Sequence, residues 1–177
     1  AMRQGAAMDR AWYEARKGLD RTGLISAFAA AHDQPLDVER LARDSLAITV
    51  ARAEETAVEN PPVAALARRL HGHIPLAVGS NAETPIVEAV LRGAGVAALF
   101  DAVVTVSEAG RAKPDPAIFA LAAQQLSTDP ARCLVLEDST EGLEAAAAAG
   151  MIGWDVRDRS VLERIARLGA GLHRGSL

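Results

Sequence analysis

The chain has 177 residues, a length typical of one domain with room for a small insertion. Half of the residues are hydrophobic but only 3% are aromatic, so a core must be built from alanine and aliphatic side chains. The net charge of −4 offers no basic surface to nucleic acid, no apolar run reaches membrane-spanning length, and no signal peptide is visible. We therefore expect a globular protein that has no nucleic-acid partner and no membrane partner.

The single cysteine, Cys133, excludes an internal disulfide within this chain and fits a reducing compartment. We therefore expect a cytoplasmic protein. Because Cys133 begins an apolar stretch, it is interpreted as a small core residue.

Residues 1–60 carry helical patterns and no strand or catalytic constellation. Helices are predicted at 9–17, after a cap at Asp20 or Thr22, and after a cap at Asp37. The Pro61-Pro62 pair marks a boundary. We predict a small helical cap over residues 1–60, followed by an α/β core over residues 61–177.

From residue 63 onward, short apolar strands alternate with helices. The predicted strands cover 74–79, 102–106, 133–136 and 152–156. The predicted helices cover 63–70, a stretch from residue 83 or 84 to a glycine at 93 or 95, 116–126, an alanine-rich run ending at Gly150, and 161–168. This alternation predicts right-handed crossovers and a Rossmann-like parallel sheet with helices on both faces.

Polar residues follow two of these strands at the carboxyl edge of the sheet, where open α/β folds bind ligands. Ser80 and Asn81 end the first strand, and a hydroxyl with free backbone amides there can hold phosphate oxygens. Ser80 can equally be an ordinary turn residue. Glu137 and Asp138 end the third strand, and paired carboxylates suit Mg²⁺ shared with a phosphate. The alternative is that Asp138 caps the next helix with Glu141 as its capping-box partner.

Lys113 lies between these two pairs in the chain, in the stretch GRAKPDP. A glycine and two prolines stiffen this loop, and a lysine held there can neutralise phosphate and carboxylate charge as a point cation. The alternative is a solvated surface lysine.

Three stretches, in this order, resemble the second, third and fourth motifs of the haloacid dehalogenase-type (HAD-like) hydrolases: LAVGSNA, GRAKPDPAIF and CLVLEDSTEGLEAAAAAGM. The similarity covers about residues 10–157 and is to the branch that contains β-phosphoglucomutase and sugar-phosphate phosphatases; KGLDRTGLI resembles the cap of that branch. The resemblance implies that Ser80 binds the transferring phosphoryl group, with help from Asn81. It implies that Lys113 is catalytic, orienting the nucleophile and binding phosphate, and that Glu137 and Asp138 bind Mg²⁺.

The chain departs from this pattern at the first motif, an apolar strand followed by DxDGT that supplies the nucleophilic aspartate. The residues before Trp12 are AMRQGAAMDRA, in which Asp9 is the only acid and falls in an expected helix. No nucleophile is therefore assigned. In the family's sheet this strand lies between those of motifs two and four, so we expect 74–79 and 133–136 to expose edges to a slot. A truncated or omitted segment is favoured over a degenerate, rearranged sheet, and an exposed edge would favour oligomers.

The leading functional hypothesis is a Mg²⁺-dependent phosphohydrolase acting on a small phosphorylated metabolite such as a sugar phosphate. The first alternative is an inactive, truncated or degenerate HAD-like protein that serves as a binding or structural module. The second is phosphoryl transfer of the phosphoglucomutase type, which would use the same residues.

Overall fold

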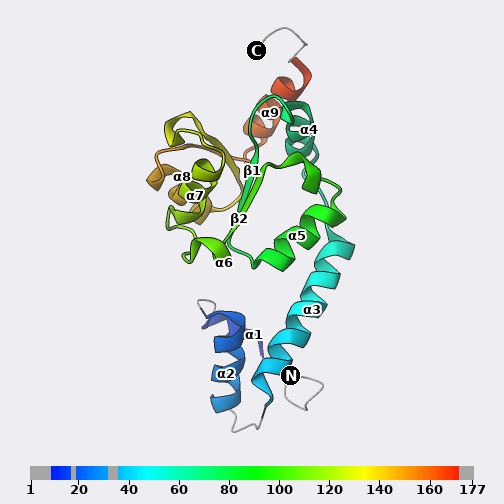
Figure 1. Ribbon diagram of the computed structural model, residues 1–177, viewed down its shortest axis with the longest axis vertical. Coiled ribbons are helices and arrows are strands. Elements are labelled where there is room, and N and C mark those ends of the chain that lie inside the picture. Colours follow the sequence, from blue (N-terminus) through cyan, green and yellow to red (C-terminus); the bar gives the residue numbers. More distant parts are fainter. Residues whose placement is uncertain (1–8, 17–18, 32–35, 172–177) are drawn as a thin grey trace. The chain divides into compact units, whose positions relative to one another are not determined.

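A computed structural model describes residues 9–16, 19–31 and 36–171 of the chain (Figure 1). The chain divides into two compact units, Ala1–Arg52 and Ala53–Leu177. The proposed division into a cap over residues 1–60 and a core over residues 61–177 stays a prediction.

The first unit is helical in its described part, as expected. It contains α1 (Arg10–Glu14), α2 (Arg21–Ala31) and most of α3 (Val38–Thr56). An aspartate precedes each helix, and its carboxylate accepts a hydrogen bond from a first-turn backbone amide. The N···O distances are 2.8 Å at Asp9, 2.6 Å at Asp20 and 3.0 Å at Asp37. The predicted caps at Asp20 and Asp37 are thus confirmed. The predicted 9–17 helix was too long, because α1 ends at Glu14 and a turn follows at Ala15 and Arg16.

The second unit alternates strands and helices. Its helices are α4 (Pro61–Leu70), α5 (Thr84–Gly93), α6 (Val106–Ala109), α7 (Ala117–Gln125), α8 (Thr140–Ala148) and α9 (Arg159–Gly171), with short 3₁₀ turns η2 (Ala97–Leu99) and η3 (Pro130–Arg132). Its strands are β1 (Ala77–Ser80), β2 (Ala102–Thr105), β3 (Leu134–Glu137) and β4 (Ile152–Asp155). All four predicted strands are present.

Each of the four predicted strands differs from the observed one by one to three residues at one or both ends, and the first two show why. The first strand begins at Ala77 and not at Ile74, because Pro75 has no N–H to donate and the main chain of Leu76 is held by Asp101. The second strand ends at Thr105, because Val106 begins the short helix α6.

The strands form two separate parallel pairs. β1 pairs with β2 in the register Ala77↔Ala102, and β3 pairs with β4 in the register Leu134↔Ile152. Among the described residues, β1 and β3 each pair on one side only. The α/β class with parallel strands is therefore confirmed, and the sheet has not closed across the expected central position.

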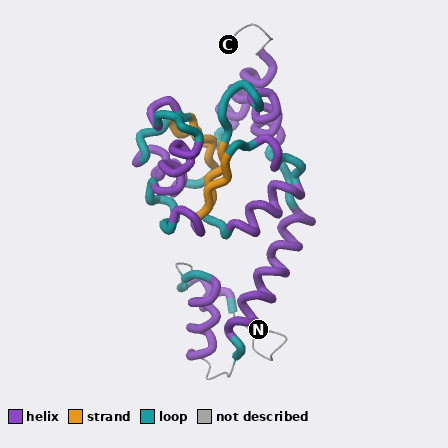
Figure 2. The backbone as a smooth tube through the Cα atoms, in the orientation of Figure 1, coloured by secondary structure: helices purple, strands orange, loops and turns teal. Residues whose placement is uncertain are grey.

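Helices cover both faces of the β1–β2 pair. On one face, Val104 packs with Ile118 and Phe119 of α7, and a Cβ on Gly79 would come within 2.9 Å of the Phe119 ring. On the other face, Val78 and Val103 pack against a buried cluster from α4, α5 and the loop after α5: Ala64, Val87, Leu91 and Val96. In Figure 2, the helices labelled α7 and α8 in Figure 1 lie to the left of the central pair β1–β2.

The β3–β4 pair is covered by α8 on one face. A Cβ on Gly153 would come within 3.1 Å of Leu143, and Ala145 and Ala146 are fully buried there. On the opposite face Leu134 and Ile152, adjacent in register, are 44% and 57% exposed. The two strand pairs thus differ in how completely they are covered.

Helices α4 and α9 pack against each other in the same unit (Figure 1), and Ile165 of α9 is fully buried. Within the described ranges, no helix has both the length and the apolar character needed to cross a bilayer.

Candidate functional site

Ser80 is the last residue of β1 and starts a tight turn. Its hydroxyl oxygen accepts the Ala82 amide hydrogen at 3.1 Å, so its own hydrogen is available for another acceptor. The side chain is half-buried at the carboxyl end of the strand. The turn interpretation and the phosphate-binding prediction are therefore compatible, because the turn fixes the hydroxyl at the edge where ligands bind.

Lys113 is not a solvated surface lysine. Its side chain is 9% exposed, and its ammonium donates to Glu137 Oε2 at 2.8 Å and to the Gly79 carbonyl at 3.3 Å. The ammonium also lies 5.2 Å from the centre of the Phe119 ring. Lys113 thereby links the carboxyl end of β1 to the carboxyl end of β3.

Asn81 holds the main chain of this lysine. Its side-chain oxygen accepts the Lys113 N–H at 2.7 Å, and its amide nitrogen donates to the Lys113 carbonyl at 3.3 Å. The loop after β1 is thus joined to the loop that carries the cation.

Glu137 is buried and accepts hydrogen bonds at both carboxylate oxygens. Oε2 accepts from Lys113, while Oε1 accepts from the Asp138 amide at 3.0 Å and from the amide and hydroxyl of Ser139 at 3.1 and 2.8 Å. Burial alone would raise the pKa of Glu137, but the hydrogen bonds from Lys113 and Ser139 outweigh it, and the pKa lies below its usual range. Glu137 is therefore ionised at neutral pH.

Gly142, in the first turn of α8, makes room for this carboxylate. A methyl group there would overlap the carboxyl carbon and an oxygen of Glu137. The amide of Gly142 donates to the Ser139 hydroxyl at 3.0 Å, which makes Ser139 the N-cap of α8. The alternative that Asp138 caps this helix was therefore wrong.

Asp138 is exposed, beside the buried Glu137. Its charge reaches the loop after β4: the Asp155 carboxylate raises the pKa of Arg157, and the negative charges of Asp138 and Glu141 raise it further. Asp138 directly follows β3, and because it is exposed and does not cap α8, its carboxylate is accessible to a cation.

The predicted site residues thus come from the carboxyl ends of β1 and β3 and from the loop between α6 and α7. They are Ser80, Asn81, Lys113, Glu137 and Asp138. A hydroxyl, an ammonium and an exposed carboxylate in this arrangement can bind a phosphate together with a hard cation. Within the described ranges, no group of three or more His, Cys, Asp or Glu side chains is suited to a metal ion. One or two carboxylates are nevertheless enough for Mg²⁺, which usually keeps several waters and shares a substrate phosphate. The donor set therefore fits Mg²⁺, with Asp138 as the open ligand.

Sequence analysis missed Ser139 and Gly142 as parts of the site. The signal for Ser139 was in the sequence, because serine directly before a helix start is a preferred N-cap. The need for glycine at position 142 could not be predicted, because it depends on where the Glu137 side chain lies.

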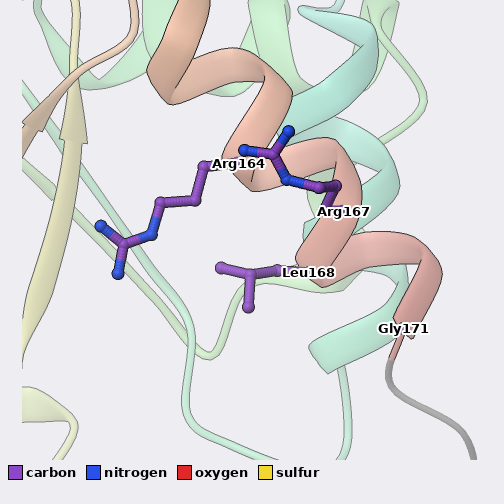
Figure 3. Close-up of a pocket in the computed structure, with 4 residues that line it drawn as sticks. All are labelled: Arg164, Arg167, Leu168 and Gly171. Atoms are coloured by element: carbon purple, nitrogen blue, oxygen red, sulfur yellow. The ribbon is translucent and has the colours of Figure 1, made fainter.

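A pocket elsewhere in the second unit is lined by α9 residues only. Figure 3 shows Arg164, Arg167, Leu168 and Gly171 around it, and none of them is a predicted site residue. Arg164 also lies over the Trp154 ring, 4.1 Å from its centre.

Parallel strands that alternate with helices define this protein as an α/β protein. Residues 6–150 match the haloacid dehalogenase-like hydrolase family, and the chain belongs to that family. The family resemblance inferred from three motifs is thereby confirmed.

The relatives fall in the branch expected. The fructose-1-phosphate phosphatase YqaB of Escherichia coli (strain K12) is 36% identical over 134 residues, which are 76% of this chain and 71% of that protein. The structure of CbbY from Rhodobacter sphaeroides in complex with phosphate is 28% identical with a TM-score of 0.67, covering 84% of this chain and 70% of that chain. A β-phosphoglucomutase from Clostridium difficile, 22% identical with a TM-score of 0.66, covers 92% and 76% respectively and shares the fold.

Proposed function

We propose that this protein is a Mg²⁺-dependent phosphohydrolase of a small phosphorylated metabolite, with a sugar phosphate as the preferred substrate class. The observation that carries the proposal is the buried Lys113 ammonium, which bridges the β1 carbonyl of Gly79 and the Glu137 carboxylate beside Asp138. Membership of a hydrolase family and the 36% identity to a fructose-1-phosphate phosphatase support the substrate class. The absence of disulfide-forming cysteine pairs supports a cytoplasmic location.

Each residue has a role in this proposal. The Ser80 hydroxyl donates to a phosphoryl oxygen, and the Lys113 ammonium offsets the charge that accumulates on the phosphoryl group as it transfers. Asp138, with Glu137 behind it, would hold Mg²⁺, which when bound supplies further positive charge against the phosphate.

A carboxylate nucleophile completes the reaction. In the family pattern an aspartate attacks phosphorus and displaces the alcohol, and water then hydrolyses the aspartyl-phosphate to release phosphate. That aspartate belongs to a DxDGT motif, and the described residues contain no such sequence. Asp9 does not replace it, because its carboxylate caps α1.

The second candidate is a non-catalytic phosphate-binding module of the same fold. The observation that favours it is that β1 and β3 each pair on one side only in the described part of the chain. This candidate retains phosphate binding at Ser80 and Lys113 but performs no turnover. Phosphoryl transfer between sugar positions uses the same residues and differs in the acceptor.

Hydrolysis of p-nitrophenyl phosphate and fructose 1-phosphate, with and without Mg²⁺, tests the proposal. We expect Mg²⁺-dependent release of phosphate that Asp138→Asn reduces by at least about a hundredfold. The matched control is Glu144→Gln, which removes an exposed charge on α8 and should leave turnover unchanged. Turnover that is equal in wild type and Asp138→Asn would contradict the assignment of the metal ligand. Phosphate binding without turnover would favour the binding module, and transfer to a second sugar hydroxyl would favour a mutase.

A further inference from the structure

The position of the Lys113 ammonium is not fixed by secondary structure, because the side chain is long and its main chain lies in a loop. The loop enters from Gly110, whose φ is +72°, and leaves into α7 at Ala117. Electrostatic stabilisation of a phosphoryl group requires the charge to be fixed to within about 0.5 Å. The main chain at Lys113 must therefore be held as well as the ammonium.

Three contacts hold the side chain of Lys113. They are the carboxylate of Glu137, the carbonyl of Gly79 and the ring of Phe119. These contacts fix the ammonium but not the main chain, because a long lysine side chain could reach the same three partners in another rotamer if the loop shifted.

The Asn81 side chain fixes the backbone. It accepts from the N–H and donates to the C=O of Lys113, 32 positions along the chain, at 2.7 and 3.3 Å. Among side chains, only Asn and Gln carry both a carbonyl acceptor and an amide donor in one planar group, which this two-bond contact requires. Asn81 follows Ser80 directly, so the residue that sets the cation adjoins the hydroxyl predicted to bind the same phosphate.

We propose that the side chain of Asn81 is a positioning residue that clamps the main chain of Lys113 and thereby sets the ammonium at the phosphate site. The side-chain amide of Asn81 is then occupied by Lys113. The predicted contact of Asn81 with phosphate would be made by its backbone N–H. The consequence for phosphate rests on the proposed function, whereas the clamp itself does not.

The composition of the chain permits a clean test by NMR. The chain has two lysines, Lys17 and Lys113, and two asparagines, Asn60 and Asn81. With ¹⁵N-labelled lysine, the full chain therefore gives two side-chain ammonium signals, and Lys113→Arg identifies the one from Lys113. The hydrogen-bonded ammonium should exchange slowly with water and have a shift distinct from that of free lysine.

Asn81→Ala should move or broaden the Lys113 signal and weaken the binding of inorganic phosphate about tenfold. Asn81→Asp keeps the acceptor but loses the donor and should have an intermediate effect on both. The matched control is Asn60→Ala, since the Asn60 side chain makes no capping hydrogen bond at the start of α4. Backbone amide spectra confirm that each variant is folded.

An unchanged Lys113 signal in folded Asn81→Ala overturns the clamp, whatever the protein does with phosphate. A perturbed Lys113 signal in a protein that binds no phosphate upholds the clamp and contradicts the proposed function instead. The two failures are thus distinguishable.

Discussion

The two strand pairs of the second unit have the same parallel geometry but differ in cover. The β1–β2 pair is packed between α7 on one face and α4 with α5 on the other. The β3–β4 pair is packed by α8 on one face and leaves Leu134 and Ile152 substantially exposed on the other. Yet both pairs contribute equally to the candidate site, because each ends in residues that contact Lys113.

This difference shows that the site does not depend on equal burial of its supporting strands. The β1–β2 pair has two apolar interfaces to stabilise it, whereas the β3–β4 pair is stabilised by α8 and by the polar network around Glu137. We therefore expect polar substitutions to affect the second pair most and apolar substitutions to affect the first pair most.

The largest effect is expected for Lys113→Met, which removes the ammonium that bonds to Gly79 of β1 and to Glu137 of β3. Glu137 would be left buried without its cation, and breaking such a pair costs about 3–5 kcal/mol of unfolding free energy. Urea denaturation of Lys113→Met, Glu137→Gln and the double variant measures this as a double-mutant cycle. A loss below about 1 kcal/mol, the range of an exposed pair, would show that the pair is solvated.

Gly142→Ala is the next largest, and it acts on the second strand pair alone. The added methyl group would overlap the Glu137 carboxylate, and overpacking of this kind costs about 1–3 kcal/mol. The control is Gly169→Ala in α9, where a Cβ meets nothing within 4 Å and helix propensity should give a gain of up to about 1 kcal/mol. Equal unfolding free energies for the two variants would contradict the position of Glu137.

The pH dependence of the unfolding free energy tests the contribution of the Glu137 carboxylate to stability. Since the pKa of Glu137 is lower in the folded protein, its contribution is present above the usual value of about 4.3 and is lost as pH falls through the folded value. The stability of the wild type should therefore fall more steeply below about pH 4.3 than that of Glu137→Gln. Parallel pH profiles for the two proteins would contradict the hydrogen-bonded, ionised state.

The smallest effect is expected when isoleucine is replaced by valine, and it should differ between a buried and an exposed position. Ile118→Val, at a fully buried position against β1–β2, should cost about 1 kcal/mol. Ile152→Val, at a 57% exposed position on β4, should change stability by less than about 0.5 kcal/mol. Thermal unfolding of both variants measures the difference, and a cost at Ile152 equal to that at Ile118 would show that another segment covers this face.

The sequence predicted the order of strands and helices because hydrophobic periodicity is a local property. The apolar run from Cys133 to Leu136 before two acids predicted a strand and its end without any knowledge of its neighbours. The expectation that the first and third strands each expose an edge came from the family's strand order. The two separate strand pairs agree with it.

What the sequence did not predict depends on side-chain directions across the site. The spacing of Asn81 and Lys113 does not show that the Asn81 side chain bonds to the Lys113 main chain, because this contact joins two loops that are distant in sequence. Likewise, Glu137 and Asp138 are neighbours in sequence, but Glu137 ends β3 and is buried, whereas Asp138 lies in the bend after the strand and is exposed. The pair was predicted as equivalent metal ligands, and whether each binds Mg²⁺ stays a prediction.

Calorimetric titration of inorganic phosphate into the protein, with and without Mg²⁺, tests the central proposal most directly. The proposal predicts that phosphate binds the wild type, that Mg²⁺ tightens this binding, and that Asp138→Asn abolishes the effect of Mg²⁺ while Glu144→Gln retains it. No phosphate binding in either condition, or an equal effect of Mg²⁺ on wild type and Asp138→Asn, would contradict a phosphate and metal site at the ends of β1 and β3.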